Sequence, residues 1–201
     1  MVERPSLTQR NRDRARDEIA RLAVGLFDRR GFDAVSVDEI AHAARVSRRT
    51  LFRYFRSKED LVFHGHDRVV ARLRELLAHD EARSELDHLT RVLRELFAGP
   101  LDAHSRAVAR LVAAVPALQA RSSHLANDFE RAVADYLQSR GHDTTRARLL
   151  AGACIGALAA ARRLATPEPG SAGRLIEEGM GMLAARWPRL RQRARAGRLD
   201  G

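Results

Sequence analysis

Residues 36–55 read SVDEIAHAARVSRRTLFRYF, which predicts two short helices joined by a tight turn. Ser36 and Glu39 have the spacing of a capping box, in which each side chain accepts a hydrogen bond from the other residue's backbone N–H, so the first helix starts there. Ser47 is placed to cap the second helix. Apolar positions that can bring the two helices together are Ile40, Ala41, Val46, Leu51 and Phe55. They predict a small core that fixes the angle between the helices.

The other side of the second helix combines basic, hydroxyl and aromatic residues, namely Arg48, Arg49, Thr50, Phe52, Arg53 and Tyr54. An arginine can donate two parallel hydrogen bonds to guanine, and an aromatic ring can contact the methyl group of thymine. Thr50 and Tyr54 are four residues apart, so their hydroxyl groups share a side and can bond one phosphate strand. The pattern therefore indicates a helix that enters the major groove of DNA, and the alternative is a solvated basic surface.

A third helix is predicted after Ser57, with Lys58 in its first turn, where free backbone N–H groups attract phosphate. Apolar periodicity continues from Leu61 to Leu77, which predicts a helix of about 20 residues that links a small head to the rest of the chain. Before the two-helix stretch, the spacing of apolar residues predicts a helix over roughly residues 11–30.

Both ends of the chain are polar and basic. The opening segment, up to about Arg16, lacks apolar periodicity and predicts a mobile arm. Arg10, Arg12 and Arg14 are candidates for contact with phosphate or with the minor groove, and plain disorder is the alternative. Residues 189–201 are rich in arginine and nearly free of apolar residues, which predicts a solvated tail.

Helical periodicity, ended by glycine and proline, continues through the rest of the chain, and no strand pattern interrupts it. Helices are predicted over residues 84–97, 101–115, 117–139 and 145–165, followed by a loop at 166–173 and an apolar helical stripe from Leu175 to Trp187. The sequence therefore predicts an all-α fold of about nine helices. The helix over 145–165 is dense in small residues, so another helix can lie close against it.

The formal net charge of +10 and the pI near 11.2 favour a polyanionic partner. Lys58 is the single lysine, however, so the dominance of arginine partly reflects compositional bias. The single cysteine, Cys154, excludes an internal disulfide framework and is expected to be an inert, packed thiol. Because no apolar run of about 18 residues and no secretory start occurs, we expect a soluble cytoplasmic protein without a membrane partner.

No metal, cofactor or catalytic site is predicted. His64 and His66 have no neighbouring cysteine and lack the spacing of a helical metal site. A nucleophile with its base and acid partners cannot be assembled either, so we expect no enzymatic activity.

The run from Phe32 to Leu61 resembles the DNA-binding head of the TetR family of bacterial regulators. The matching elements are Gly31-Phe32, Ser36, Ile40-Ala41, Val46-Ser47, Thr50-Leu51-Phe52, Tyr54-Phe55 and Ser57-Lys58-Glu59-Asp60-Leu61. The resemblance implies an all-helical homodimer with a three-helix head, a connecting helix, a small-molecule pocket in the body, and a bundle made by the last two helices of each chain.

For DNA, the resemblance implies phosphate contacts from Ser36, Thr50, Tyr54 and Lys58, and base contacts from Arg48, Arg49, Phe52 and Arg53. Two residues depart from the family pattern. Arg45 stands where glycine is usual in the turn, so we expect a left-handed or strained backbone there. Asp38 stands where some relatives place a basic base-reading residue, and its carboxylate would repel phosphate or accept a hydrogen bond from cytosine N4.

The resemblance also divides the chain into a DNA-binding helix-turn-helix domain with its arm (1–57), a ligand-binding and dimerisation domain (58–188) and the basic tail (189–201). The candidate dimer-interface residues on the last two helices are Leu149, Gly152, Ala153, Gly156, Leu175, Ile176, Gly179, Met180, Leu183 and Trp187.

Segments 110–118 and 146–153 resemble an actinobacterial branch of the family whose effectors include fatty acyl-CoA thioesters. The apolar pocket candidates are Phe97, Leu101, Leu111, Val115, Phe129, Val133 and Tyr136, which equally suit a plain core. Arg106 and Arg110 share a helix face and can hold an anionic head group, or they are simply solvated. An acyl-CoA or fatty acid is therefore the expected effector class.

These patterns together predict a ligand-responsive repressor that binds a palindromic operator as a dimer and is released by a small hydrophobic or acyl-type effector. The alternative is a helical small-molecule sensor that acts through protein–protein contacts without specific DNA binding. The sequence does not specify the effector, the operator or the regulated genes.

Overall fold

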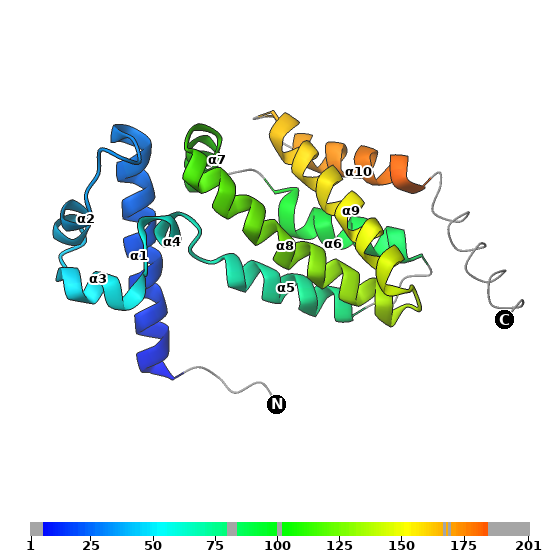
Figure 1. The fold of residues 1–201 in the computed structure, drawn as a ribbon, viewed down its shortest axis with the longest axis horizontal. Helices are drawn as coiled ribbons and strands as arrows, with labels where there is room; N and C mark the ends of the chain where they lie inside the picture. The colour runs from blue at the N-terminus through cyan, green and yellow to red at the C-terminus, as the bar shows by residue number, and fades with distance from the viewer. Residues whose placement is uncertain (1–5, 80–83, 100–101, 167, 169, 185–201) are drawn as a thin grey trace, which may run out of the picture. The chain divides into compact units, whose positions relative to one another are not determined.

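The computed structural model describes residues 6–79, 84–99, 102–166, 168 and 170–184, and within them it contains ten α-helices and no β-strand (Figure 1). The helices are α1 (Leu7–Arg30), α2 (Val37–Ala43), α3 (Arg48–Tyr54), α4 (Lys58–Val62), α5 (His66–Ala78), α6 (Glu85–Phe97), α7 (Ala103–Ala114), α8 (Pro116–Ser139), α9 (Thr144–Leu164) and α10 (Ser171–Ala184). The prediction of an all-α fold is confirmed.

Packing divides the helices into two compact units that do not follow the chain in order. The first unit holds α1 to α4, α7 and the beginning of α8. The second unit holds nearly all of α5 together with α6, the remainder of α8, α9 and α10.

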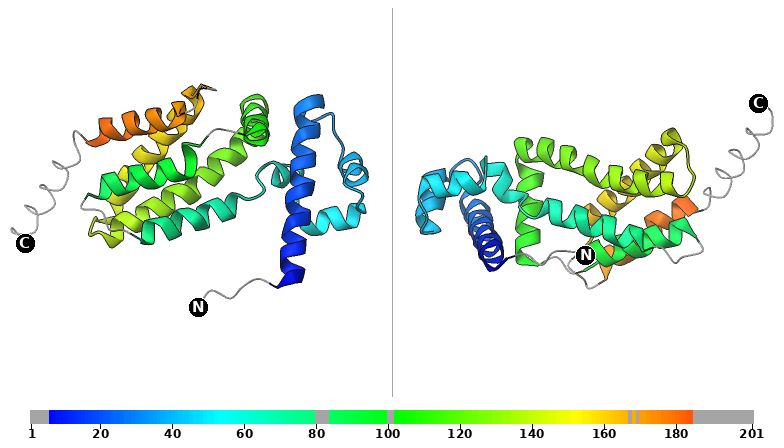
Figure 2. Two further views of the ribbon diagram at one scale, coloured as in Figure 1. Left: turned by 180° about the vertical axis from the view of Figure 1, so that it is seen from behind. Right: turned by 90° about the horizontal axis from the view of Figure 1, so that it is seen from below.

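The long helix α1 is central to the first unit, where it contacts α2, α4 and α7. Figure 2 shows α2 and α3 together on one side of it. Ala23 and Phe27 of α1 are fully buried and pack in one core with Ile40 of α2 and Leu51 of α3. This shared core fixes the angle between α2 and α3, because burial of these side chains is the main stabilising contribution available to such short helices.

The predicted mobile arm is wrong for residues 7–10, and the predicted helix over 11–30 begins earlier, because residues 7–30 form the single helix α1. Ser6 caps the helix, since its side chain accepts a hydrogen bond from the backbone N–H of Gln9 at 3.2 Å. Gln9 in turn donates to Asp13, one turn further along, at 3.2 Å. These local bonds stabilise a helix that apolar periodicity alone does not reveal.

The predicted single connecting helix is also wrong, because it is divided into α4 and α5. Phe63 ends α4, and Gly65 has a φ of +93°, a left-handed conformation that only glycine adopts without steric cost. The segment therefore forms two helices instead of one, and this break supplies the tenth of the described helices.

In the second unit, α10 packs against both α9 and α6. A Cβ atom built at Gly179 would lie 3.2 Å from the Cβ of Ala157 on α9, and one at Gly173 would lie 3.2 Å from that of Ala98 after α6. Small residues thus permit the close approach that the composition of the 145–165 segment predicts. Helix α10 begins at Ser171, inside the predicted loop, and Trp187 and the tail 189–201 lie outside the described residues.

None of the described helices combines the length and hydropathy that a membrane span needs.

Candidate nucleic-acid interface

The predicted capping box at the start of α2 is present. The Ser36 side chain accepts from the N–H of Glu39 at 3.2 Å, and Oε2 of Glu39 accepts from the N–H of Ser36 at 2.8 Å. Arg30, at the end of α1, donates to Oε1 of Glu39 at 2.7 Å. The backbone bond from Ser36, followed by the bond from Arg30, lowers the pKa of Glu39 to about 2. One carboxylate therefore joins the start of α2 to the end of α1.

The turn between α2 and α3 contains Arg45 with a φ of +54°, which confirms the expected left-handed backbone. The turn is closed by backbone hydrogen bonds from Arg45 to His42 and from Val46 to Ala41, each 3.0 Å long. Ser47 then caps α3 by accepting from the N–H of Thr50 at 3.1 Å, and the two hydroxyl groups share a further hydrogen bond of 2.9 Å.

Helix α3 is clearly two-sided. Leu51 and, at its end, Phe55 are buried in the core of the first unit, with exposed fractions of 1% and 4%. Arg48, Arg49 and Arg53 are exposed, as is the large apolar ring of Phe52 at 44%. Thr50 and Tyr54 are half-buried at the edges of this face. The predicted sidedness is therefore confirmed, while contact of these residues with DNA stays a prediction.

Two of the exposed arginines have partners within the head. Nη1 of Arg48 contacts both carboxylate oxygens of Asp38 on α2, at 3.0 and 3.2 Å, and its guanidinium lies 5.5 Å from the centre of the Phe52 ring. The guanidinium of Arg53 lies 5.3 Å from the ring centre of Tyr54. The carboxylate that departs from the family pattern is thus engaged with one of the predicted base-reading residues.

Lys58 has a structural contact that the sequence does not suggest. Its ammonium group donates to the backbone carbonyl of Phe32 at 2.5 Å and lies 4.5 Å from the centre of the Phe32 ring. A phosphate contact from Lys58 would have to compete with this arrangement or share it. Ser36, the other predicted phosphate contact at a helix start, is exposed.

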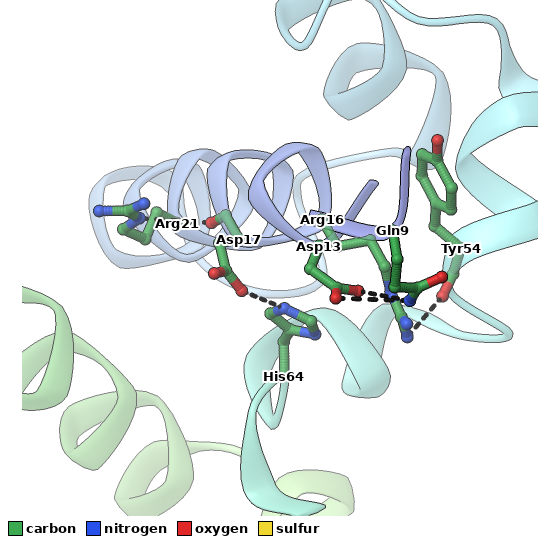
Figure 3. Close-up of polar contacts among 7 residues, drawn as sticks. All are labelled: Gln9, Asp13, Arg16, Asp17, Arg21, Tyr54 and His64. Atoms are coloured by element: carbon green, nitrogen blue, oxygen red, sulfur yellow. Dashed lines mark hydrogen bonds and ion pairs between the residues drawn. The ribbon is translucent and has the colours of Figure 1, made fainter. Parts of the chain in front are cut away.

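Two side chains of α1 contact the last residue of α3 and a residue just after α4 (Figure 3). Nη2 of Arg16 donates to the carbonyl oxygen of Tyr54, the last residue of α3, at 3.4 Å. Asp17 contacts Nε2 of His64, just after α4, at 2.6 Å, and the His64 ring meets Phe55 edge-on at 5.4 Å. Sequence reasoning missed these positioning residues because Arg16 and Asp17 lie far along the chain from their partners.

The candidate pocket residues are distributed over both units. In the second unit, Phe97 and Phe129 stack edge to face at 5.7 Å, and Val133 and Tyr136 are buried in the same core. In the first unit, Leu111 is buried and Val115 half-buried. Arg106 is exposed on α7, and Leu101 lies outside the described residues.

Arg110, the other candidate for an anionic head group, pairs with Asp28 of α1 through hydrogen bonds of 3.0 and 2.8 Å. A groove of about 640 Å³ lies in the second unit between α6 and α10 and is lined by residues that include Leu86, Thr90, Arg91, Arg94 and Met180. None of the predicted pocket residues lines this groove.

The candidate interface residues also differ in exposure. Ile176 and Met180 are each 1% exposed and face the core of their own chain. Gly152, Ala153, Leu175, Gly179 and Leu183 are half-buried. Leu149 and Gly156 are exposed, and Met182, which the sequence interpretation did not include, is exposed as well. Contact of any of these residues with a second chain stays a prediction.

Elsewhere in the part of the chain that the structure describes, no group of three His, Cys, Asp or Glu side chains lies close enough to hold a metal ion. Cys154 is fully buried in the second unit, and its burial raises the pKa of the thiol to about 12.

The short helices, the tight turn and the exposed basic face of α3 define a helix-turn-helix protein. The model of the "Bacterial regulatory proteins, tetR family" matches residues 19–64, and the model of the "MftR C-terminal domain" matches residues 99–188. A putative mycofactocin biosynthesis transcriptional regulator, MftR of Mycobacterium tuberculosis, is 31% identical over 139 residues, which cover 68% of this chain and 70% of that protein. The chain belongs to the TetR family of bacterial transcriptional regulators, as its resemblance predicts.

Solved structures share the fold. FadR of Thermus thermophilus, in complex with lauroyl-CoA, has a TM-score of 0.58 and 23% identity, and the match covers 84% of this chain and 93% of that one. The complex of SmeT with triclosan has a TM-score of 0.65 and 17% identity, with coverages of 86% and 91%.

Proposed function

We propose that this regulator is a repressor that binds a palindromic operator as a homodimer and is released by a small-molecule effector. The observation that carries the proposal is the two-sidedness of α3, where Leu51 and Phe55 are buried while Arg48, Arg49 and Phe52 are exposed. Such a helix offers hydrogen-bond donors and an apolar ring to base edges in the major groove. A bacterial protein with this partner acts in the cytoplasm.

Dimerisation follows from the requirement for two reading helices. Two α3 helices that enter successive major grooves on one face of DNA lie about 34 to 36 Å apart, or a compatible multiple. Leu149 and Gly156 of α9, together with Met182 of α10, supply exposed apolar and small surface in the segment where the family resemblance places the dimer bundle.

For the effector, we propose an acyl-CoA or a fatty acid. The lauroyl-CoA complex of the Thermus FadR protein, which has the same fold, supports this class, and the triclosan complex of SmeT supports a hydrophobic ligand more broadly. A coupling free energy of about 1 to 3 kcal/mol between effector and operator would lower DNA affinity roughly 5- to 150-fold.

Fluorescence anisotropy with labelled duplexes from the DNA beside the gene tests the proposal. We expect specific binding that weakens steeply as salt concentration rises, because basic residues release counterions from the phosphate backbone. Adding lauroyl-CoA, free fatty acids or triclosan in separate titrations identifies the effector class. Salt-insensitive binding, or no binding to any flanking duplex, would favour the alternative of a sensor that acts through protein contacts alone.

A further inference from the structure

We propose that Asp38 is a specificity-determining residue, which fixes the guanidinium of Arg48 so that its free edge reads a guanine. This inference rests on the proposed function and deepens it, because it assigns a base and a division of roles to two residues of the head. Asp38 lies in the first turn of α2, and Arg48 is the first residue of α3.

The contact engages one end of the guanidinium only. Both carboxylate oxygens of Asp38 approach Nη1 of Arg48, at 3.0 and 3.2 Å. Nε and Nη2 form the opposite edge, whose two N–H bonds are parallel. That edge matches the O6 and N7 acceptors of guanine in the major groove. The carboxylate therefore occupies the one nitrogen that guanine does not need.

Phe52 restricts the same side chain from a second direction. It follows Arg48 by one helical turn, and the guanidinium lies 5.5 Å from its ring centre. With a carboxylate on Nη1 and an aromatic ring beside the guanidinium, Arg48 loses much of the rotamer freedom that an exposed arginine otherwise has. Less entropy is then lost when the base contact forms.

The pair contributes little to folding. The side chains of Arg48 and Asp38 are 62% and 64% exposed, and ion pairs between exposed groups add little to the free energy of unfolding. Asp38 also places a negative charge on the surface that approaches phosphates, so it opposes non-specific DNA binding. A group that weakens general affinity while it orients a base-reading residue raises the ratio of specific to non-specific binding.

We expect the loss of the Asp38 charge to have opposite effects on two kinds of DNA. A bidentate pair provides a preference for guanine of about 5- to 150-fold at one position of each half-site. In Asp38→Asn this preference is reduced to a few-fold. Binding to a scrambled duplex becomes tighter, because a negative charge is removed. Arg48→Ala abolishes the same preference, and Asp38→Asn adds no further loss in the Arg48→Ala background.

The experiment is selection from duplexes with randomised half-sites, followed by anisotropy titration of the selected site and of a scrambled duplex. It uses the wild type, the two single variants, the double variant, and Glu18→Gln as a control that changes the same charge at an exposed position of α1. Circular dichroism confirms that each variant is folded.

The expected result is loss of one guanine preference in Asp38→Asn and in Arg48→Ala, with no such change in Glu18→Gln. Three results would overturn the inference if the wild type still binds specifically. They are an unchanged guanine preference in Asp38→Asn, a change at a different base pair, and additive losses in the double variant. If the wild type selects no sequence at all, the proposed function itself fails, and the role of Asp38 fails with it.

Discussion

Asp28 of α1 and Arg110 of α7 are joined by two hydrogen bonds, from Nε and Nη2 of the guanidinium to the two carboxylate oxygens, at 3.0 and 2.8 Å. The hydrogen bond from Arg110 holds the pKa of the Asp28 carboxyl below its usual value. Helix α7 is thereby attached to the helix that also contacts the ends of α3 and α4 through Arg16 and Asp17. Helices α7 and α3 of the first unit thus both contact α1.

If this pair acts as a unit, its loss is not additive. We expect Asp28→Ala and Arg110→Ala each to lower the midpoint of thermal unfolding, and the double variant to lower it no further than the worse single variant. Thermal melts followed by circular dichroism provide the measurement. Shifts in the double variant that equal the sum of the two single shifts would show that the residues stabilise the protein independently.

Arg49 and Lys58 are both predicted to contact DNA, but we expect their substitutions to differ. Arg49→Ala should weaken binding to the operator by about 5- to 150-fold and leave the unfolding midpoint unchanged, because the side chain is exposed. Lys58→Ala should weaken binding on all sequences and also lower the midpoint, since it removes the hydrogen bond to Phe32. A Lys58→Ala variant with wild-type thermal stability would mean that this bond does not stabilise the head.

Glu39 should make the stability of the head depend on acidity. Its pKa is lowered from 4.5 to about 2, so its stabilising contribution is fully present above pH 4.5 and is lost as pH falls toward 2. We expect Glu39→Gln to melt at a lower temperature than the wild type at pH 7, and the difference to shrink across that window. Asp33→Asn, an exposed carboxylate on the neighbouring loop, serves as the control. A difference that stays constant from pH 7 to 2 would argue against a charged capping box.

Cys154 should be unreactive in the folded protein. Burial raises the pKa of its thiol to about 12, so little thiolate forms at pH 8 and reagents cannot reach it. We expect an aromatic disulfide reagent to label native protein far more slowly than protein in guanidinium chloride. Equal labelling rates would place the thiol at the surface.

The parts of the fold that the sequence predicts correctly depend on residues within four positions of each other. Ser36, Ser47 and Ser57 all cap helices as their spacing suggests. Each of these features is a local competition between side chain, backbone and solvent. Tertiary context does not need to be known to anticipate them.

The features that were missed join residues far apart in the chain. The pairs Asp38–Arg48 and Asp28–Arg110 each link two helices, and Lys58 of α4 bonds the carbonyl of Phe32 in the loop before α2. A single sequence does not specify how these elements meet. The apolar stripe of α10 was likewise predicted, but the surface that it packs against was not. Ile176 and Met180 face the core of their own chain, where a partner chain was expected.

The central claim is that the exposed face of α3 reads bases in the major groove. Methylation interference tests it directly, because methylating N7 of guanine blocks a major-groove acceptor without altering the phosphates. We predict that methylation of a guanine in each half-site prevents binding by the wild type, and that the interference disappears at that guanine for Arg48→Ala or Arg49→Ala. Binding that tolerates methylation at every guanine, or interference that both variants leave unchanged, would contradict the assignment of α3 as the reading helix.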